Sequence, residues 1–245
     1  MIKMITINDL EKNYNGSPVL NNLSITFDSK GIDIIVGVNG SGKTTLLNCI
    51  CDITSFQKGD IKINSVSRKE KEAKLKMFYI PSDFYLPEYL SGNEYADFIF
   101  RRYKDVNKEL FEFITEMYHL TSFLDEKISN YSYGMKKKLQ IGIALALKIE
   151  YVLADEVFNG LDYESYLLTE YLIKKYSALR KFILISHNMD FIMRNEQANI
   201  YLLSKGTLST IKNVGDIEGI VINNGELQKY YEKIDGFISR NKSLT

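Results

Sequence analysis

The sequence predicts an α/β fold in which a helical segment interrupts a core of strands and helices. An apolar stretch at residues 32–38, IDIIVGV, leads into a glycine-rich loop and then into a helical pattern, TTLLNCICDI. Residues from about 94 to 149 carry helical periodicity with no strand pattern between the helices. Strand patterns return at residues 151–154 and 182–186, so the core resumes after the insertion.

The N-terminal residues predict a small antiparallel sheet that flanks this core. Residues 1–10 and 23–28 alternate apolar and polar side chains, and Asn15-Gly16 between them is a turn dipeptide. Residues 61–64 and 76–80 give two more short strands.

The C-terminal part predicts a hairpin and a last helix. The stretch IYLLSKGTLSTI turns at Lys205-Gly206, and GELQKYYEKIDGFISR is amphipathic. We therefore expect one domain at residues 1–211, followed by a C-terminal extension with a helix at residues 212–245. Within the domain, the expected core covers residues 1–83 and 150–211, and the expected helical subdomain covers about 84–149.

Length and charge bound the kind of protein. A chain of 245 residues suits one substantial core. Because 31 basic and 31 acidic residues cancel, no global field favours nucleic acid as a partner. The one basic triplet, Lys136–Lys138, is predicted to be the exposed face of a helix. With no signal peptide and no apolar run of about 20 residues, we expect a cytoplasmic protein that meets a membrane only through a partner.

The stretch GVNGSGKTT matches the nucleotide-binding pattern G-x-x-x-x-G-K-[ST]. Its glycines let the backbone curl so that successive N–H groups point at phosphate oxygens, and the following helix adds its positive end. Lys43 would neutralise the β- and γ-phosphates, and the Thr44 hydroxyl would ligate Mg²⁺. This predicts a P-loop NTPase core that uses ATP and Mg²⁺. The predicted ATP-binding residues are Gly37, Val38, Asn39, Gly40, Ser41, Gly42, Lys43, Thr44 and Thr45.

A pair of acids follows the buried-strand pattern at residues 151–154. In a P-loop protein the first acid, Asp155, would hold Mg²⁺, usually through water. The second, Glu156, would polarise the water that attacks the γ-phosphate. The alternative is a strand followed by an acidic helix cap, which leaves the sequence NGLD at residues 159–162 unexplained.

With these motifs in this order, residues 1 to about 210 resemble the nucleotide-binding subunit of ABC transporters. The resemblance implies an ATPase whose active sites form between two such subunits, each P-loop facing the signature motif of the other. The implied partners are a second copy of the chain or a homologous subunit, together with integral membrane permease subunits. The chain would then lie on the inner face of the cell membrane through the permease.

Two stretches resemble the family's signature motif, LSGGQ. Residues 90–92 (LSG) lie too far upstream, and Ser91 or Asn93 there is interpreted as a helix cap. NYSYGMKKKL lies just before the acidic strand, with Ser132, Gly134 and Met135 at the signature positions. Tyr133 replaces the first glycine of the family pattern, and Met135 replaces its glutamine. A serine hydroxyl at a helix N-terminus suits the γ-phosphate of a partner's ATP.

The resemblance assigns three further residues. His187 follows the strand FILIS, where the family's switch histidine contacts the γ-phosphate and steadies the attacking water. Tyr14 matches the aromatic residue that stacks on adenine. Asp162 matches the acid of the D-loop, residues 159–162, which communicates across the dimer.

The sequence departs from the family at the end of the strand MFYI. There the family has a glutamine whose amide oxygen can join the Mg²⁺ shell, whereas this chain has Ser82. The serine side chain is shorter, so it would need a bridging water or a closer loop to reach the metal. Ser82 is therefore a candidate Mg²⁺ residue on alignment alone.

The signature form S-x-G-M-K resembles the ABC-2 type exporters, which implies export of a peptide or drug. Two alternatives stay open: the ATPase subunit of an importer, and a soluble ABC protein that acts on ribosomes or DNA. The single cassette and the absence of sustained heptads in the sequence speak against the soluble protein.

Overall fold

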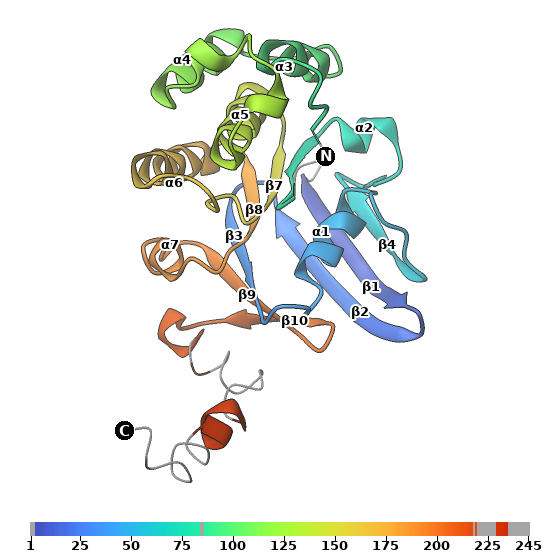
Figure 1. The fold of residues 1–245 in the computed structure, drawn as a ribbon. Coiled ribbons are helices and arrows are strands. Elements are labelled where there is room, and N and C mark those ends of the chain that lie inside the picture. The colour runs from blue at the N-terminus through green and yellow to red at the C-terminus, as the bar shows by residue number, and fades with distance from the viewer. Residues whose placement is uncertain (1–2, 84–85, 218, 220–228, 235–245) are drawn as a thin grey trace, which may run out of the picture.

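The computed structural model describes residues 3–83, 86–217, 219 and 229–234. They form two sheets with helices on their faces and a helical lobe at one end (Figure 1). The strands are β1 (Met4–Tyr14), β2 (Ser17–Asp28), β3 (Gly31–Val36), β4 (Lys58–Ile63), β5 (Val66–Ser67), β6 (Met77–Ile80), β7 (Tyr151–Asp155), β8 (Lys181–Ile185), β9 (Asn199–Ser204) and β10 (Thr207–Ile211). The α-helices are α1 (Lys43–Ile50), α2 (Lys71–Lys74), α3 (Gly92–Phe100), α4 (Lys108–Met117), α5 (Tyr133–Ala146), α6 (Tyr163–Ser177) and α7 (Met189–Met193).

The larger sheet has six strands in the order β10-β9-β3-β8-β7-β6. Neighbouring strands run parallel except at the β9–β10 hairpin. The smaller sheet, β2-β1-β4-β5, is antiparallel. The predicted α/β fold with a flanking antiparallel sheet is therefore confirmed, as are the turn at Asn15-Gly16 and the hairpin at Lys205-Gly206.

The central strands are buried because both faces of the larger sheet are covered. On one face α1 packs between the two sheets, with Leu46 in one apolar cluster with Ile5 and Leu153. On the other face α6 and α7 pack against Ile34 and Leu184. This two-sided burial explains the continuous apolar runs of the strands. The carboxyl ends of β3, β6, β7 and β8 meet at one edge, so the segments that follow them converge.

The helical lobe consists of α3, α4 and α5, at the top of Figure 1. α4 crosses α5 closely, since a Cβ at Gly142 of α5 would lie 3.5 Å from the Phe111 ring. The interpretation of Ser91 as a cap is confirmed: its hydroxyl accepts from the N–H of Glu94 (3.1 Å), whose carboxylate accepts from the N–H of Ser91 (2.8 Å).

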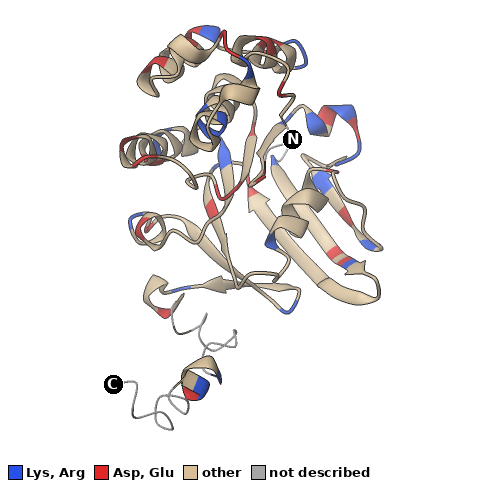
Figure 2. Ribbon diagram, in the orientation of Figure 1, with Lys and Arg blue, Asp and Glu red and all other residues tan. Residues whose placement is uncertain are grey.

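The structure corrects the prediction for Lys136–Lys138. Lys137 is fully buried, and the Lys136 and Lys138 side chains are only 17% and 14% exposed. Lys136 pairs with Glu88 and Lys138 with Asp162, each at 2.8 Å. The triplet is covered because α5 packs against α3 and α4 on one side and against β6 and α6 on the other, so these lysines are not an exposed face. Elsewhere the two signs of charge are interspersed over the ribbon (Figure 2).

The predicted last helix falls mostly outside the described residues, of which 229–234 are helical. Within the described part of the chain, no helix combines the length and apolar character needed to cross a membrane.

Candidate functional site

The predicted P-loop joins β3 to α1 as the sequence predicts. Gly42 caps α1 with a left-handed φ of 101°, and Gly37 allows a close approach, since a Cβ there would lie 2.5 Å from the carbonyl oxygen of Leu203. The buried Lys43 ammonium donates to the carbonyls of Gly37 (2.8 Å) and Val38 (3.1 Å). Carbonyl groups of the loop thus hold the ammonium group of Lys43.

The electrostatics of the loop suit an anion. Burial lowers the pKa of Lys43, while the carboxylates of Glu156 and Asp155 act in the opposite direction. The Ser41 hydroxyl is buried without a hydrogen-bond partner among the described residues. A phosphate oxygen would satisfy that hydroxyl and favour the charged form of Lys43.

Thr44 and Asp155 come together from α1 and the end of β7. The Thr44 hydroxyl donates to Asp155 Oδ2 at 2.6 Å, across 111 residues of sequence. Hydroxyl and carboxylate oxygens are the hard donors that Mg²⁺ prefers, with waters completing the octahedron. These two residues fit the predicted Mg²⁺ site, where the ion would neutralise phosphate charge.

Glu156 lies next to this pair in an unusual backbone conformation. Its φ is +51°, in the left-handed region that non-glycine residues rarely adopt, and its N–H donates to the Ile185 carbonyl at 3.0 Å. Strained backbone of this kind persists where surrounding contacts enforce it, commonly at functional sites. Burial raises the pKa of Glu156, as does Asp155, while the backbone N–H of His187, Lys43 and Lys137 oppose the rise. A buried carboxylate with a raised pKa is a stronger base than an exposed one.

His187 follows β8 and faces Glu156, with its Nε2 3.4 Å from Glu156 Oε1. Burial lowers the pKa of His187, with Lys43 acting in the same direction and Asp155 against it. The ring is therefore neutral near pH 7 and can donate from one nitrogen and accept at the other.

The predicted signature residues lie at the N-terminus of α5. The Ser132 hydroxyl caps the helix by accepting from the N–H of Met135 at 3.2 Å. Gly134 touches the D-loop of the same chain, since a Cβ at Gly134 would lie 2.5 Å from the Gly160 carbonyl oxygen. A larger residue at position 134 would separate the two segments.

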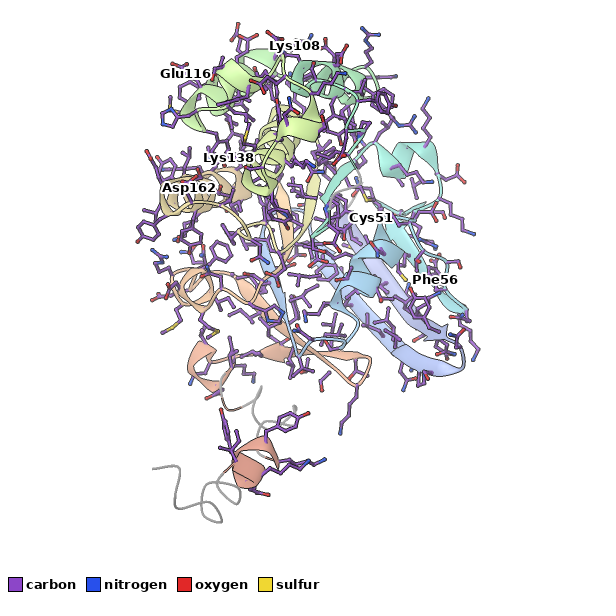
Figure 3. All side chains as sticks on the ribbon, viewed as in Figure 1. Cys51, Phe56, Lys108, Glu116, Lys138 and Asp162 are labelled. Carbon is purple, nitrogen blue, oxygen red and sulfur yellow. The ribbon has the colours of Figure 1, made fainter. Side chains whose placement is uncertain are left out.

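Asp162, at the end of the D-loop, caps α6 and is held by Lys138 of α5 (Figure 3). Its hydrogen bond to Lys138 and its bonds to Ser165 keep the pKa of Asp162 well below its usual range. It is therefore ionised at any physiological pH.

Tyr14 lies at the end of β1, 45% exposed, with the Lys12 ammonium 4.3 Å from its ring centre. Val19 of the same hairpin would meet a Cβ at Gly42 at 2.8 Å, so this hairpin flanks the P-loop. An exposed ring beside the P-loop is compatible with the predicted stacking on adenine.

Ser82 lines the same pocket as Thr44, but no hydrogen bond joins the two among the described residues. Its carbonyl, rather than its hydroxyl, is engaged, by the hydroxyl of Tyr133 at 2.6 Å. The structure therefore brings together the P-loop, Asp155, Glu156 and His187. The role of Ser82 as a Mg²⁺ residue stays a prediction.

Sequence reasoning missed Lys137, whose ammonium donates to the Pro81 carbonyl at 3.1 Å. Burial lowers the pKa of Lys137 to about 8, although Asp155, Glu156 and Asp83 favour its charged form. A helical wheel could have revealed its burial, because position 137 shares a face with Ile141 and Ala144.

Lys137 predicts a pH-dependent stability. Its pKa of about 8 in the folded protein lies below the ordinary 10.5, so between these values the unfolded chain binds more protons. The destabilising effect of its buried charge is therefore present below about pH 8 and is lost as the pH rises toward 10.5. We expect the free energy of unfolding of the wild type, relative to Lys137→Met, to rise by about 1–3 kcal/mol across this window.

Urea unfolding at several pH values measures this difference, with the exposed Lys108→Met as the matched control. If the free energies of unfolding of the wild type and of Lys137→Met change in parallel with pH, the buried charge of Lys137 does not destabilise the fold.

A P-loop, two acids and a histidine that converge at the ends of parallel strands define the class of P-loop ATPases. The sequence profile of the ABC transporter family matches residues 20–159. The chain belongs to this family, and it is an ATPase.

Its relatives are ATP-binding proteins of different transport systems. The energy-coupling factor transporter ATP-binding protein of Aster yellows witches'-broom phytoplasma is 28% identical, over 84% of this chain and 78% of the relative. The tungstate uptake system ATP-binding protein of Peptoclostridium acidaminophilum is 30% identical, over 88% and 98%. The cytochrome c biogenesis ATP-binding export protein of Reclinomonas americana is 26% identical, over 88% and 97%. Uptake and export both occur among them, so the predicted direction of transport stays a prediction.

The fold also matches solved structures. An ATP-binding subunit of an ABC transporter superimposes with a TM-score of 0.79 at 21% identity, over 95% of this chain and 99% of that one. At 21% identity the likeness concerns the fold alone, and it agrees with the predicted P-loop NTPase architecture.

Proposed function

We propose that this ATPase is the motor subunit of a transporter: it binds ATP with Mg²⁺, pairs with a second ATPase subunit, and drives separate permease subunits in the membrane. The observation that carries the proposal is the convergence of Lys43, Thr44, Asp155, Glu156 and His187 at one sheet edge. A loop that binds phosphate, an oxygen pair for Mg²⁺ and a buried base are the parts that phosphoryl transfer to water needs.

In the proposed mechanism each residue acts on ATP or on the attacking water. The P-loop N–H groups and Lys43 hold the phosphates and neutralise their charge. Glu156 accepts a proton from the attacking water, and His187 orients that water from the end of the neighbouring strand β8. Tyr14 stacks on adenine. Bound Mg²⁺, held by Thr44 and Asp155, supplies additional positive charge for the developing phosphate oxyanions.

The second half of each active site comes from the partner subunit. Ser132 and Gly134 stand at the positive end of α5, which suits the γ-phosphate of ATP bound to the other copy. Asp162, which pairs with Lys138, would communicate across the interface between the two ATPase subunits. In this proposal residues 1–83 and 150–211 act as the core, residues 84–149 as the lobe that carries the signature, and residues 212–245 as an extension.

We propose export as the direction, on the signature form S-x-G-M-K at residues 132–136. Import is the second candidate, and the tungstate uptake relative, aligned over 98% of its length, favours it. For export, a peptide or drug is the proposed substrate class.

Purification of the tagged full chain from detergent-solubilised membranes with ATP tests the proposal. We expect a multispanning membrane protein to co-purify, and ATPase turnover of the complex to exceed that of the isolated chain. Recovery of the chain with ribosomes or DNA, and with no integral membrane protein, would contradict a transport role. A solute-binding protein in the complex would decide for import.

A further inference from the structure

The first two turns of α5 hold the segment after β6 at two consecutive carbonyl groups. The Tyr133 hydroxyl donates to the Ser82 carbonyl at 2.6 Å, and the Lys137 ammonium donates to the Pro81 carbonyl at 3.1 Å. Tyr133 and Lys137 are four residues apart and so lie on one face of the helix. The Lys137 ammonium is 5.6 Å from the centre of the Tyr133 ring.

These contacts involve two of the chain's departures from the family pattern. Ser82 stands where the family has glutamine, and Tyr133 stands where the signature has glycine. Because the acceptors are backbone carbonyls, the contacts do not depend on the side chain at position 82. A glycine at position 133 has no side chain and could not make the bond. In this chain, therefore, side chains of α5 contact the turn at residues 81–82, which lacks the glutamine of the family.

The same two residues also touch the parts of the active site on either side. The Tyr133 ring covers Gly160 of the D-loop so closely that a Cβ there would overlap the ring. Lys137 holds Pro81, which follows Ile80, and Ile80 pairs with Ala154, the residue before the acids. Ser132, which precedes Tyr133, caps the same helix. One pair of side chains thus holds the turn after β6, which lies beside the end of β7 that carries the acids, against the helix that follows the signature serine.

A purely structural role explains Lys137 poorly. Lys137 is 0% exposed, and burial of a charge is costly unless favourable contacts compensate for it. Burial lowers the pKa of Lys137, although nearby carboxylates favour its charged form. An apolar residue of similar volume would be expected to stabilise the fold or leave it unchanged.

We propose that Tyr133 and Lys137 form a clamp that positions the turn at residues 81–82 and fixes Glu156 relative to the signature serine of the same chain. The clamp rests on the proposed roles of Glu156 and Ser132. Its two members are positioning residues, since they act on ATP hydrolysis through other groups. Through the clamp, the position of Ser132 toward a partner's ATP depends on the positions of Asp155 and Glu156 in the same chain.

Steady-state ATPase kinetics of the full chain test the clamp with Tyr133→Phe, Lys137→Met and the double variant. We expect each single change to lower kcat about 3- to 10-fold, because each removes one hydrogen bond that orients the turn. KM and the affinity for a fluorescent ATP analogue should stay within about twofold, because neither side chain belongs to the proposed nucleotide-binding set. The double variant should be no more than about twofold slower than the slower single variant, because both residues hold one turn.

Stability separates positioning from a structural role. The melting temperature of Lys137→Met should equal or exceed that of the wild type while its turnover falls. Tyr171→Phe and Lys108→Met, which change exposed residues away from the clamp, are the matched controls and should keep wild-type turnover.

Either of two results would overturn the clamp: single variants with kcat within twofold of the wild type, or losses that multiply in the double variant together with lower melting temperatures. Glu156→Gln is measured in parallel. If it is slow while the clamp variants are normal, the clamp fails and the proposed function stands. If it keeps wild-type turnover, the proposed function fails, and the clamp fails with it.

Discussion

Replacing Glu156 with glutamine is expected to lower kcat for ATP hydrolysis by about 10²–10⁴-fold, because general-base catalysis contributes an acceleration of that order. The substitution keeps the size of the side chain, and its amide oxygen can still accept from the backbone N–H of His187. What is lost is the ability to take a proton from water. Burial and the neighbouring Asp155 raise the pKa of the native carboxyl, so the native group is a better base than an exposed glutamate.

ATP binding should survive this change, since Glu156 lies outside the phosphate-binding loop. A single-turnover assay and equilibrium binding of a fluorescent ATP analogue separate the two effects. Glu116→Gln, an exposed change on α4, is the control for loss of one carboxylate. Turnover within twofold of the wild type in Glu156→Gln would remove Glu156 as the base.

Replacing Lys43 with methionine is expected to lower the affinity for Mg²⁺–ATP by about 100-fold. A hydrogen bond to a charged group contributes about 1.5–3 kcal/mol, and each 1.4 kcal/mol is about tenfold in affinity. Lys43 is the buried cation of the P-loop, and methionine keeps most of its length without charge or donor.

The same analogue-binding assay measures this loss, with the exposed Lys30→Met as the control. The carbonyls of Gly37 and Val38 lose their donor in Lys43→Met, so thermal unfolding must show that the fold survives. Affinity within threefold of the wild type in a folded variant would contradict the role of Lys43 in binding phosphate.

Sequence reasoning could predict the P-loop because its residues are consecutive and each has a local mechanism. The strand patterns likewise predicted that Asp155 and His187 each follow a strand, and the structure shows that these strands, β7 and β8, are neighbours whose following residues lie at one sheet edge. The contact between Thr44 and Asp155, 111 residues apart, follows from that arrangement.

Other features depend on how elements dock, and the sequence carries little signal for them. Lys137 is buried because α5 lies across the end of β6, where the Lys137 ammonium donates a hydrogen bond to the Pro81 carbonyl. The left-handed backbone of Glu156 has no local sequence cue, since glutamate is not a residue that favours positive φ. Nothing in the sequence analysis predicts α6, because exposed Tyr163 and Tyr171 obscure its buried stripe.

In the proposed dimer, each active site combines the P-loop of one subunit with the signature of the other. Lys43→Met disables the P-loop and leaves Ser132 intact. Ser132→Asp keeps an N-cap at α5 but places a negative charge against the partner's γ-phosphate. In a mixed dimer one site carries both defects and the other carries none.

The ATPase rate of an equimolar mixture of these two inactive variants therefore tests the claim directly. With random pairing, half of the dimers are mixed and each has one intact site, so the mixture should regain about a quarter of the wild-type rate. A mixture no more active than the sum of its two separate components would contradict shared active sites and show that each chain hydrolyses ATP with its own signature.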